Sequence, residues 1–535
     1  MRQVAIICAA ACLTFAAGTA TSAAQCLPIT IGNADGNYIV PGVKGDIVYR
    51  RVDGVALSMD AYVQQRGTRR PAIIVAHGGN WDTGSRVAFI GQFLEPLTRA
   101  GYNWFAVDYR LGGLARHREA VEDLRAAVEF VRCHAADFHV DPDRIALLGE
   151  DAGAELSLLL AAEAPAGVAA VVSIGGFYDL ADVASLKARY PAELLARASP
   201  ATQPLARMPP TLVIHGGNDT EVPPGQGERF CVALRAAGRA CEFAPVEGAI
   251  HRPENWWPSQ WRYKDRLTAW LATTLRLAAP DHEPYVTTLK KDIVFSPANG
   301  LKLDAYAPAG PGPFPAVIIA HGGGWEAGDK VTYATPVFEP LARAGFAWFT
   351  IDYRLTPEFR NQDQLQDLRE AIRFVRANAA RFRVDPDRIA ILGESASGQM
   401  VAQLATERTE GVAAVVSFYG VYDFLQMATS FAPRSVPARL FGLREMNDEA
   451  RKVLTAFSPF HQAKSGMPPL LLIQGTADRL HAQALAFGER LEALKADYER
   501  YDVPGAPHGM ENWEGHPAWA GYKEKLVEWL TRKLR

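Results

Sequence analysis

The chain has 535 residues, of which 48% are hydrophobic and 21% charged, the balance of a soluble globular protein. Lys and Arg total 56 and Asp and Glu total 59, so the net charge is only −3. That balance argues against a basic surface for nucleic acid. Since one domain usually takes roughly 100–200 residues, the length predicts more than one hydrophobic core.

The first 24 residues have the pattern of an export signal. A short positive start precedes an apolar run over residues 4–17, and small residues lead up to Ala24. A run of about 14 residues is too short to cross a bilayer, and no later stretch is apolar enough to span one. We therefore expect cleavage near Ala24 and a secreted or periplasmic mature protein.

Four cysteines follow this segment: Cys26, Cys133, Cys231 and Cys241. Their spacing differs from the paired cysteines of a zinc site, and four cysteines allow three disulfide pairings. Cys231 and Cys241 flank a predicted helix-to-strand turn and are the best candidates for a disulfide. Buried free thiols are the alternative, because a large core does not need covalent links.

The chain contains an internal repeat. Residues 94–151 and 338–395 align without a gap at an offset of 244, and 33 of these 58 positions are identical. A period of this size indicates domain duplication. The stretch 279–284, which contains prolines and charges, predicts domains over residues 25–280 and 281–535.

Each half alternates predicted strands and helices. In the second half, residues 292–295 and 301–306 predict an opening hairpin around 297–300. Continuous apolar runs then predict strands buried on both faces, and residues 365–378 have the apolar spacing of a helix. The pattern predicts a mostly parallel, doubly wound α/β sheet with helices on both faces, twice over.

Three residues in the second half follow predicted strands in the chain order Ser, Asp, His, which is the order used for nucleophilic catalysis on this type of sheet. Ser395 stands in Gly-Glu-Ser-Ala-Ser, between a buried strand and a helix that begins near Ala396, the context of a nucleophile elbow. Asp478 and His508 follow later strands. We expect Ser395 to attack a carbonyl, His508 to carry the proton and Asp478 to orient the histidine.

The segment His-Gly-Gly-Gly-Trp, residues 321–325, ends an earlier predicted strand. The backbone N–H groups of Gly323 and Gly324, with that of Ala396, are candidates for stabilising an oxyanion. His321 is expected to brace this loop.

Both halves resemble α/β-hydrolases of the carboxylesterase group related to hormone-sensitive lipase. The resemblance is carried by these motifs, by the Asp-Pro-Asp-Arg-Ile-Ala segment and by the turns that contain Asp478 and His508. More narrowly, the two halves resemble secreted acetyl-xylan and feruloyl esterases. The resemblance implies two tandem α/β-hydrolase domains and a serine esterase that uses no cofactor and no metal. Ser397 departs from it, because the family usually has glycine there.

The substrate is less well defined by the sequence. Asp423 and Asp478 are 55 positions apart, against 40 for the matching Asp179 and Asp219, so the second half carries an excursion that can act as a lid. Its apolar residues are Phe424, Leu425, Met427, Phe431, Leu440 and Phe441. Candidate pocket residues are Trp325, Glu394 and Trp513.

Small-molecule esters or acylated carbohydrate, with acetyl or feruloyl groups, are the candidate substrates. No nucleic-acid partner is expected, and the oligomeric state stays open. A secreted amidase or peptidase of the same fold, and a non-catalytic binding protein built from hydrolase folds, are the alternatives.

The first half departs from this pattern at its nucleophile. Asp151 stands where the repeat has Ser395, while Asp219 and His251 match the other two triad members. In one interpretation Asp151 is a nucleophile, as in hydrolases of haloalkanes and epoxides. In the other, which we favour, the first half does not hydrolyse, because a carboxylate attacking an ester would put a negative charge beside the oxyanion and would give an anhydride.

In that second interpretation, the backbone donors that favour an oxyanion are expected to hold the Asp151 carboxylate instead. The first half would then stabilise the second or bind a substrate chain across Trp81, Trp256 and Trp257.

Overall fold

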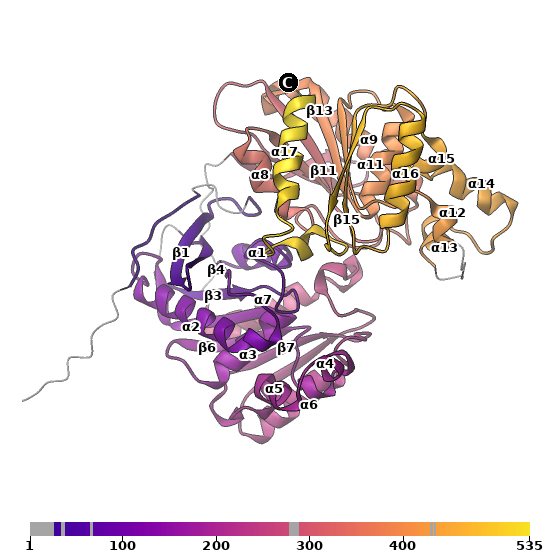
Figure 1. Ribbon diagram of the computed structural model, residues 1–535. Coiled ribbons are helices and arrows are strands. Elements are labelled where there is room, and N and C mark those ends of the chain that lie inside the picture. Colours follow the sequence, from indigo (N-terminus) through magenta and orange to yellow (C-terminus); the bar gives the residue numbers. More distant parts are fainter. Residues whose placement is uncertain are drawn as a thin grey trace, which may run out of the picture.

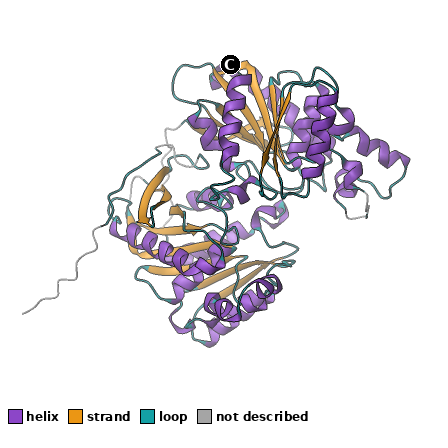
Figure 2. Cartoon of the chain, in the orientation of Figure 1, coloured by secondary structure: helices purple, strands orange, loops and turns teal. Residues whose placement is uncertain are grey.

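The computed structural model describes residues 26–33, 38–64, 68–277, 288–428, 432 and 435–534. The predicted export signal and the predicted boundary at residue 280 lie outside these ranges. Figure 1 shows the two halves as two lobes, each with helices on both sides of a sheet, and Figure 2 shows the same layering by secondary structure.

Each half contains one eight-stranded sheet, and the two sheets have the same strand order. The first follows the order β1-β2-β4-β3-β5-β6-β7-β8 and the second β9-β10-β12-β11-β13-β14-β15-β16. In each sheet the second strand, β2 or β10, pairs antiparallel with both of its neighbours. The remaining strand pairs are parallel. The strands of the first half are β1 (Lys44–Val52), β2 (Val55–Tyr62), β3 (Arg70–Ala76), β4 (Asn103–Val107), β5 (Val140–Glu150), β6 (Val168–Ile174), β7 (Thr211–Gly216) and β8 (Cys241–Val246). Those of the second half are β9 (Leu289–Ser296), β10 (Leu301–Tyr306), β11 (Phe314–Ala320), β12 (Ala347–Ile351), β13 (Val384–Glu394), β14 (Ala414–Phe418), β15 (Leu470–Gly475) and β16 (Tyr498–Val503).

Helices connect the strands and cover both faces of each sheet. The α-helices of the first half are α1 (Gly91–Arg99), α2 (His117–Cys133), α3 (Ala152–Ala162), α4 (Ala184–Arg189), α5 (Ala192–Ala198), α6 (Gly225–Ala236) and α7 (Tyr263–Leu275). Those of the second half are α8 (Phe338–Arg343), α9 (Asn361–Ala377), α10 (Ala379–Phe382), α11 (Ala396–Glu407), α12 (Phe424–Met427), α13 (Val436–Phe441), α14 (Asp448–Ala456), α15 (Pro459–Gln462), α16 (His481–Ala493) and α17 (Gly521–Lys533).

The structure confirms the predicted fold, two mostly parallel doubly wound sheets in tandem. The opening hairpin is β9 and β10, and the predicted helix over 365–378 corresponds to α9, which begins earlier, at Asn361, and ends at Ala377. The central strands are buried on both faces, as in β3, where every residue is buried. This explains why they appear in the sequence as unbroken apolar runs.

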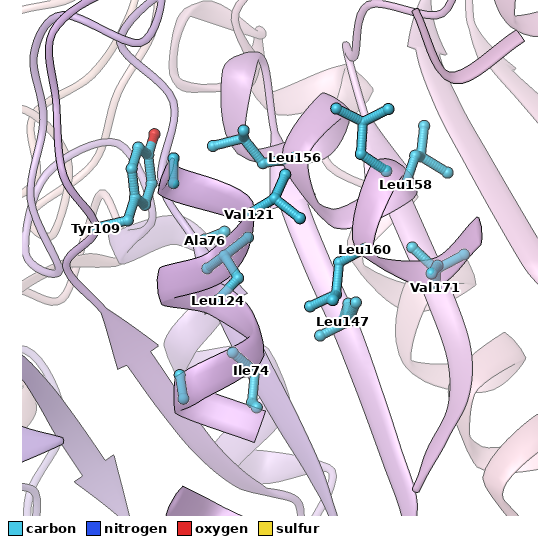
Figure 3. Packing of buried hydrophobic residues seen from close by; sticks show 14 of the residues in the cluster. Ile74, Ala76, Tyr109, Val121, Leu124, Leu147, Leu156, Leu158, Leu160 and Val171 are labelled. Atoms are coloured by element: carbon cyan, nitrogen blue, oxygen red, sulfur yellow. The ribbon is translucent and has the colours of Figure 1, made fainter. Parts of the chain in front are cut away.

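Packing of the helices against the sheet fixes the turn that carries the nucleophile position. Figure 3 shows Val121 and Leu124 of α2 and Leu156 of α3 among the side chains of the first core, which also includes Leu147 of β5. Every residue of α3 is buried. Because β5 and α3 are both held in the core, the single residue that joins them has a fixed backbone position.

The two halves meet through contacts that cross between the copies. At the repeat offset of 244, Gly91 corresponds to Thr335 and Val87 to Val331. Thr335 donates a hydrogen bond to the Val87 carbonyl at 2.7 Å, and a Cβ on Gly91 would lie 2.5 Å from the Val331 carbonyl. Matching positions therefore meet reciprocally, as they do across a two-fold interface.

Two disulfides lie in the described part of the first half. Cys231 pairs with Cys241, as predicted, and joins α6 to β8. Cys26 pairs with Cys133, tying the start of the described chain to the end of α2. Within the described ranges, no helix is long and apolar enough to cross a bilayer.

Candidate active site

The structure brings Ser395, His508 and Asp478 together at the carboxyl ends of parallel strands. Ser395 Oγ lies 2.8 Å from His508 Nε2, and His508 Nδ1 lies 2.7 Å from Asp478 Oδ2. The three side chains follow β13, β16 and β15, whose parallel pairing places their carboxyl ends at one edge of the sheet. The arrangement is an unbroken chain from hydroxyl to imidazole to carboxylate.

Ser395 occupies a tight strand-to-helix turn with an unusual backbone conformation, φ 55° and ψ −112°. A Cβ at Gly393 would lie 2.3 Å from the Ser397 carbonyl, so the turn requires glycine there. Ser397, the departure from the family pattern, fits inside the turn because its hydroxyl accepts from the Glu394 amide and donates to the Ala320 carbonyl.

The acid of this triad is held in its charged form. Burial alone would raise the pKa of Asp478, but the hydrogen bond and charge of His508 outweigh burial and lower the pKa below its usual value. The Leu480 amide and the Gln474 side chain donate to the same carboxylate at 2.9 Å. Asp478 can therefore orient the imidazole and stabilise its protonated form.

Buried side chains stabilise the loop at residues 321–325. His321 stacks on Tyr353 with ring centroids 4.3 Å apart, and burial lowers its pKa to about 4, so it is a neutral structural residue, as expected. The Gly322 amide donates to the Glu394 carboxyl group. Glu394 is buried, and burial raises its pKa well above the usual value.

The structure places the three pocket candidates among buried side chains. Trp325 is 3% exposed and Trp513 is 1% exposed, and their indole N–H groups donate to Gln399 and to the Pro507 carbonyl. Together with Glu394, they support the loops around Ser395 from within.

The excursion after β14 forms the helices α12 to α15, which project beyond the sheet in Figure 1. Phe424 is fully buried and lies between Trp325 and Phe441, with ring centroids 5.6 and 4.9 Å away. Leu425, Met427 and Phe441 are partly buried against the same core and Leu440 is buried; Phe431 lies outside the described residues. The excursion is thus packed on the loop that carries the candidate oxyanion donors.

The matching site of the first half is an ion cluster. The Gly79 and Asn80 amides both donate to Asp151 Oδ2 at 2.8 Å. His251 lies 3.1 Å from the other Asp151 oxygen and 2.8 Å from Asp219. The donors that match Gly323 and Gly324 of the second half are therefore occupied by the protein's own carboxylate, as the sequence suggested.

The charges in this cluster stabilise one another. Burial alone would lower the pKa of His251, but the hydrogen bonds that His251 donates to the carboxylates of Asp151 and Asp219 outweigh burial and raise the pKa to about 11. Burial opposes ionisation of Asp151, but His251 lowers its pKa to about 2. A histidine that stays protonated cannot accept a proton from a nucleophile.

The first-half site is also closed. The His251 side chain is 8% exposed, against 36% for His508, and the ring of Phe177 lies 5.8 Å from that of His251. Among the tryptophans expected to bind a substrate chain, Trp81 and Trp256 are buried. Trp257 is 41% exposed and is the one of the three with an accessible ring.

Sequence reasoning missed Gln474, which donates to Asp478 and belongs to no motif. It named Glu394 as a pocket candidate but did not foresee its hydrogen bond from the Gly322 amide. It also missed that Arg252 of the first half contacts Asn512 of the second. The repeated Glu-Asn-Trp after each histidine was the available signal.

Within the described residues, no group of three or more His, Cys, Asp or Glu could hold a metal ion.

The fold and this geometry define the protein as a tandem α/β-hydrolase. The family model BD-FAE matches residues 59–234 and again residues 303–491, and the chain belongs to that family.

Among curated proteins, the chain is 33% identical over 221 residues to Esterase LipC of Mycobacterium tuberculosis, covering 38% of this chain and 55% of that protein. It is 29% identical over 217 residues to the probable carboxylic ester hydrolase LipM of the same organism, covering 37% of this chain and 50% of LipM. The chain thus spans about half the length of these relatives.

Among solved structures, a truncated carbohydrate esterase from gut microbiota aligns with a TM-score of 0.42 and 26% identity, covering 46% of this chain and 96% of that one.

Proposed function

We propose that the protein is a carboxylic-ester hydrolase that works through Ser395, His508 and Asp478 of its second half. The observation that carries the proposal is the unbroken hydrogen-bonded chain between these three side chains. The esterase names of its curated relatives and its family membership support the same reaction class.

In the proposed reaction, the Ser395 hydroxyl loses its proton to His508 Nε2 as Oγ bonds to the ester carbonyl carbon. The carbonyl oxygen becomes negative and is stabilised by the amides of Gly323, Gly324 and Ala396, where one such donor is worth about 3 kcal/mol. His508 then protonates the departing alcohol, leaving an acyl group on Ser395. Water, deprotonated by His508, attacks this acyl group and releases the acid.

For the substrate we propose small esters or acylated carbohydrate, with acetyl and feruloyl groups as the first to assay. This rests on the resemblance of the motifs to secreted acetyl-xylan and feruloyl esterases. Export fits the two disulfides, because such bonds persist in oxidising compartments.

For the first half we propose that Asp151, Asp219 and His251 form a non-hydrolytic site, since His251 is already protonated and the amides are occupied.

The test is covalent labelling with a fluorophosphonate, followed by turnover of p-nitrophenyl esters of increasing acyl length and of acetylated or feruloylated sugars. Label is expected on Ser395, and Ser395→Ala should abolish turnover while leaving the circular dichroism spectrum unchanged. Ser395→Ala, His508→Ala and the double variant should be about equally inactive, since triad members act as a unit. Turnover retained in Ser395→Ala would require a second active centre, and absence of label would reject the proposal.

A further inference from the structure

The segments that follow the two histidines are themselves a repeat, and they lie against each other between the halves. At an offset of 257, His251 aligns with His508 and Glu254-Asn255-Trp256 with Glu511-Asn512-Trp513. Both include a turn of 3-10 helix, over Pro253–Asn255 and Met510–Trp513. In both, the tryptophan indole donates at 2.7 Å to a carbonyl just before the histidine. The two segments are therefore built alike.

One hydrogen-bonded path crosses from the first half to the triad of the second. Arg252 Nη1 donates to Asn512 Oδ1 at 3.1 Å. The other end of the same amide, Asn512 Nδ2, donates to the His508 carbonyl at 2.8 Å. Since His508 Nε2 is the atom that contacts Ser395 Oγ, a cation of the first half is connected through one side chain to the residue that moves the proton.

Arg252 also marks a difference between the copies. The second half has Gly509 at the matching position, with φ 93°, and the first half has Asp151 where the second has Ser395. The two substitutions introduce opposite charges that interact: Arg252 contributes to the lowered pKa of Asp151. The guanidinium lies 5.1 Å above the Phe89 ring, which supports it from the first half.

The surroundings favour a cation at this point. Buried carboxyl groups from both halves lie around it: Arg252 Nη1 is 3.8 Å from Glu254, and Arg252 also acts on Glu150 and Glu511. Burial and Glu254 raise the pKa of Glu511 to about 7, against the opposing effect of His508 and Arg252. Loss of the Arg252 charge would remove the cation that acts on all three of these acids, Glu150, Glu254 and Glu511, and would break its hydrogen bond to Asn512.

We propose that Arg252 is a positioning residue for the active centre of the second half: through Asn512 it holds the His508 loop so that Nε2 stays within hydrogen-bonding distance of Ser395. This inference rests on the proposed function. It also assigns a role to the first half, which supplies the cation and, through Asp151 and Phe89, keeps it in place. Because a displacement of about 1 Å near reacting groups can cost on the order of 100-fold in rate, we expect the effect to fall on kcat.

The experiment uses the full-length chain and measures kcat and KM for a p-nitrophenyl ester, with active sites counted by fluorophosphonate titration. Arg252→Met should lower kcat per titrated site by about 10- to 100-fold with KM changed less than about threefold. Arg252→Lys, which keeps the charge and a donor, should recover most of kcat. Arg266→Met is the matched control, because Arg266 pairs with Glu242 inside the first half, and it should behave as wild type.

Asn512→Asp tests the second link, since aspartate can still accept from Arg252 but cannot donate to the His508 carbonyl. It should lower kcat about as much as Arg252→Met, and the double variant should be little worse than either single one.

Wild-type kcat per site in Arg252→Met would overturn the inference, as would a loss seen only as fewer titratable sites. Additive losses in the double variant would also overturn it, because the two residues would then act separately. These results differ from failure of the proposed function, in which the wild-type protein itself shows neither label on Ser395 nor turnover.

Discussion

At the scale of single residues, one substitution separates the two sites. Ser395 and Asp151 have nearly the same backbone conformation, with φ 55° and 51°. The Ser395 hydroxyl contacts the imidazole of His508, whereas the Asp151 carboxylate binds two amides and an imidazole. The first-half site thus holds a carboxylate against the two amides that match the candidate oxyanion donors of the second half.

This ion cluster predicts a pH-dependent contribution to stability. Asp151→Asn should lower the free energy of unfolding of the first half by about 3 kcal/mol at pH 6, because it breaks a buried charge pair. The folded pKa of His251, about 11, lies above the free value of about 6.5. Its contribution is therefore complete below about pH 6.5 and is lost as the pH rises toward 11.

Asp151 behaves oppositely, since its folded pKa of about 2 lies below the free value of about 3.9. Its contribution is present above about pH 4 and is lost as the pH falls toward 2. Urea denaturation at pH 6 and pH 9.5 measures the free energy of unfolding of the wild-type protein and of Asp151→Asn. The difference between the two proteins should be smaller at pH 9.5. Asp182→Asn, which affects an exposed ion pair with Arg229, is the control. Equal differences at both pH values for Asp151→Asn would contradict this account.

At the scale of elements, the loop after β11 depends on a carboxyl group at the end of β13. Because burial raises the pKa of Glu394 well above the usual value, Glu394→Gln mimics the neutral acid and keeps an acceptor for the Gly322 amide. We expect it to retain kcat within about threefold. Glu394→Ala leaves that amide unpaired and should lower kcat tenfold or more by displacing the loop. Steady-state kinetics on one short ester would decide, and equal losses in both variants would show that the hydrogen bond is not the cause.

The two disulfides constrain elements over very different lengths of chain. Cys231–Cys241 spans 10 residues and Cys26–Cys133 spans 107. Loop entropy in the unfolded state gives about 3 kcal/mol for a short loop and nearer 5 kcal/mol for one of this longer length. Replacing Cys26 and Cys133 by serine should therefore lower the urea midpoint more than replacing Cys231 and Cys241. The reverse order would show that loop length does not control this stability.

At the scale of the whole molecule, the reciprocal contact between copies predicts where the interface is tight. Gly91 begins α1, and a Cβ there would meet the Val331 carbonyl of the other half at 2.5 Å. Alanine favours a helix over glycine by about 1 kcal/mol, so the substitution should suit α1 but force the halves apart. Gly91→Ala is expected to lower the melting temperature and kcat together.

Gly225→Ala is the matched control, because Gly225 begins α6 and its Cβ would meet only the end of the Arg229 side chain, at 3.2 Å. It should leave both quantities near wild type. Differential scanning calorimetry and ester turnover measure the two effects. A Gly91→Ala protein as stable and active as wild type would show that the halves tolerate separation at this point.

The sequence by itself determined the fold class and the duplication, and it predicted that Ser395, Asp478 and His508 act together, three residues that the structure brings into contact. These depend on local patterns: apolar runs for strands buried on both faces, a glycine-flanked turn between strand and helix, and polar residues directly after strands. The same patterns showed that Asp151 differs from the matching residue, Ser395, because the two copies of the repeat can be compared position by position.

Only the tertiary structure decided what lies against these residues. Burial of Trp325, Trp513 and Trp256, the closure of the first-half site, and the path from Arg252 to His508 all depend on contacts between segments far apart in the chain. The physical cause of these contacts is packing between the two copies of the fold, which brings matching segments together. The charged residues at that interface follow no regular spacing in the sequence, so the sequence does not predict their contacts.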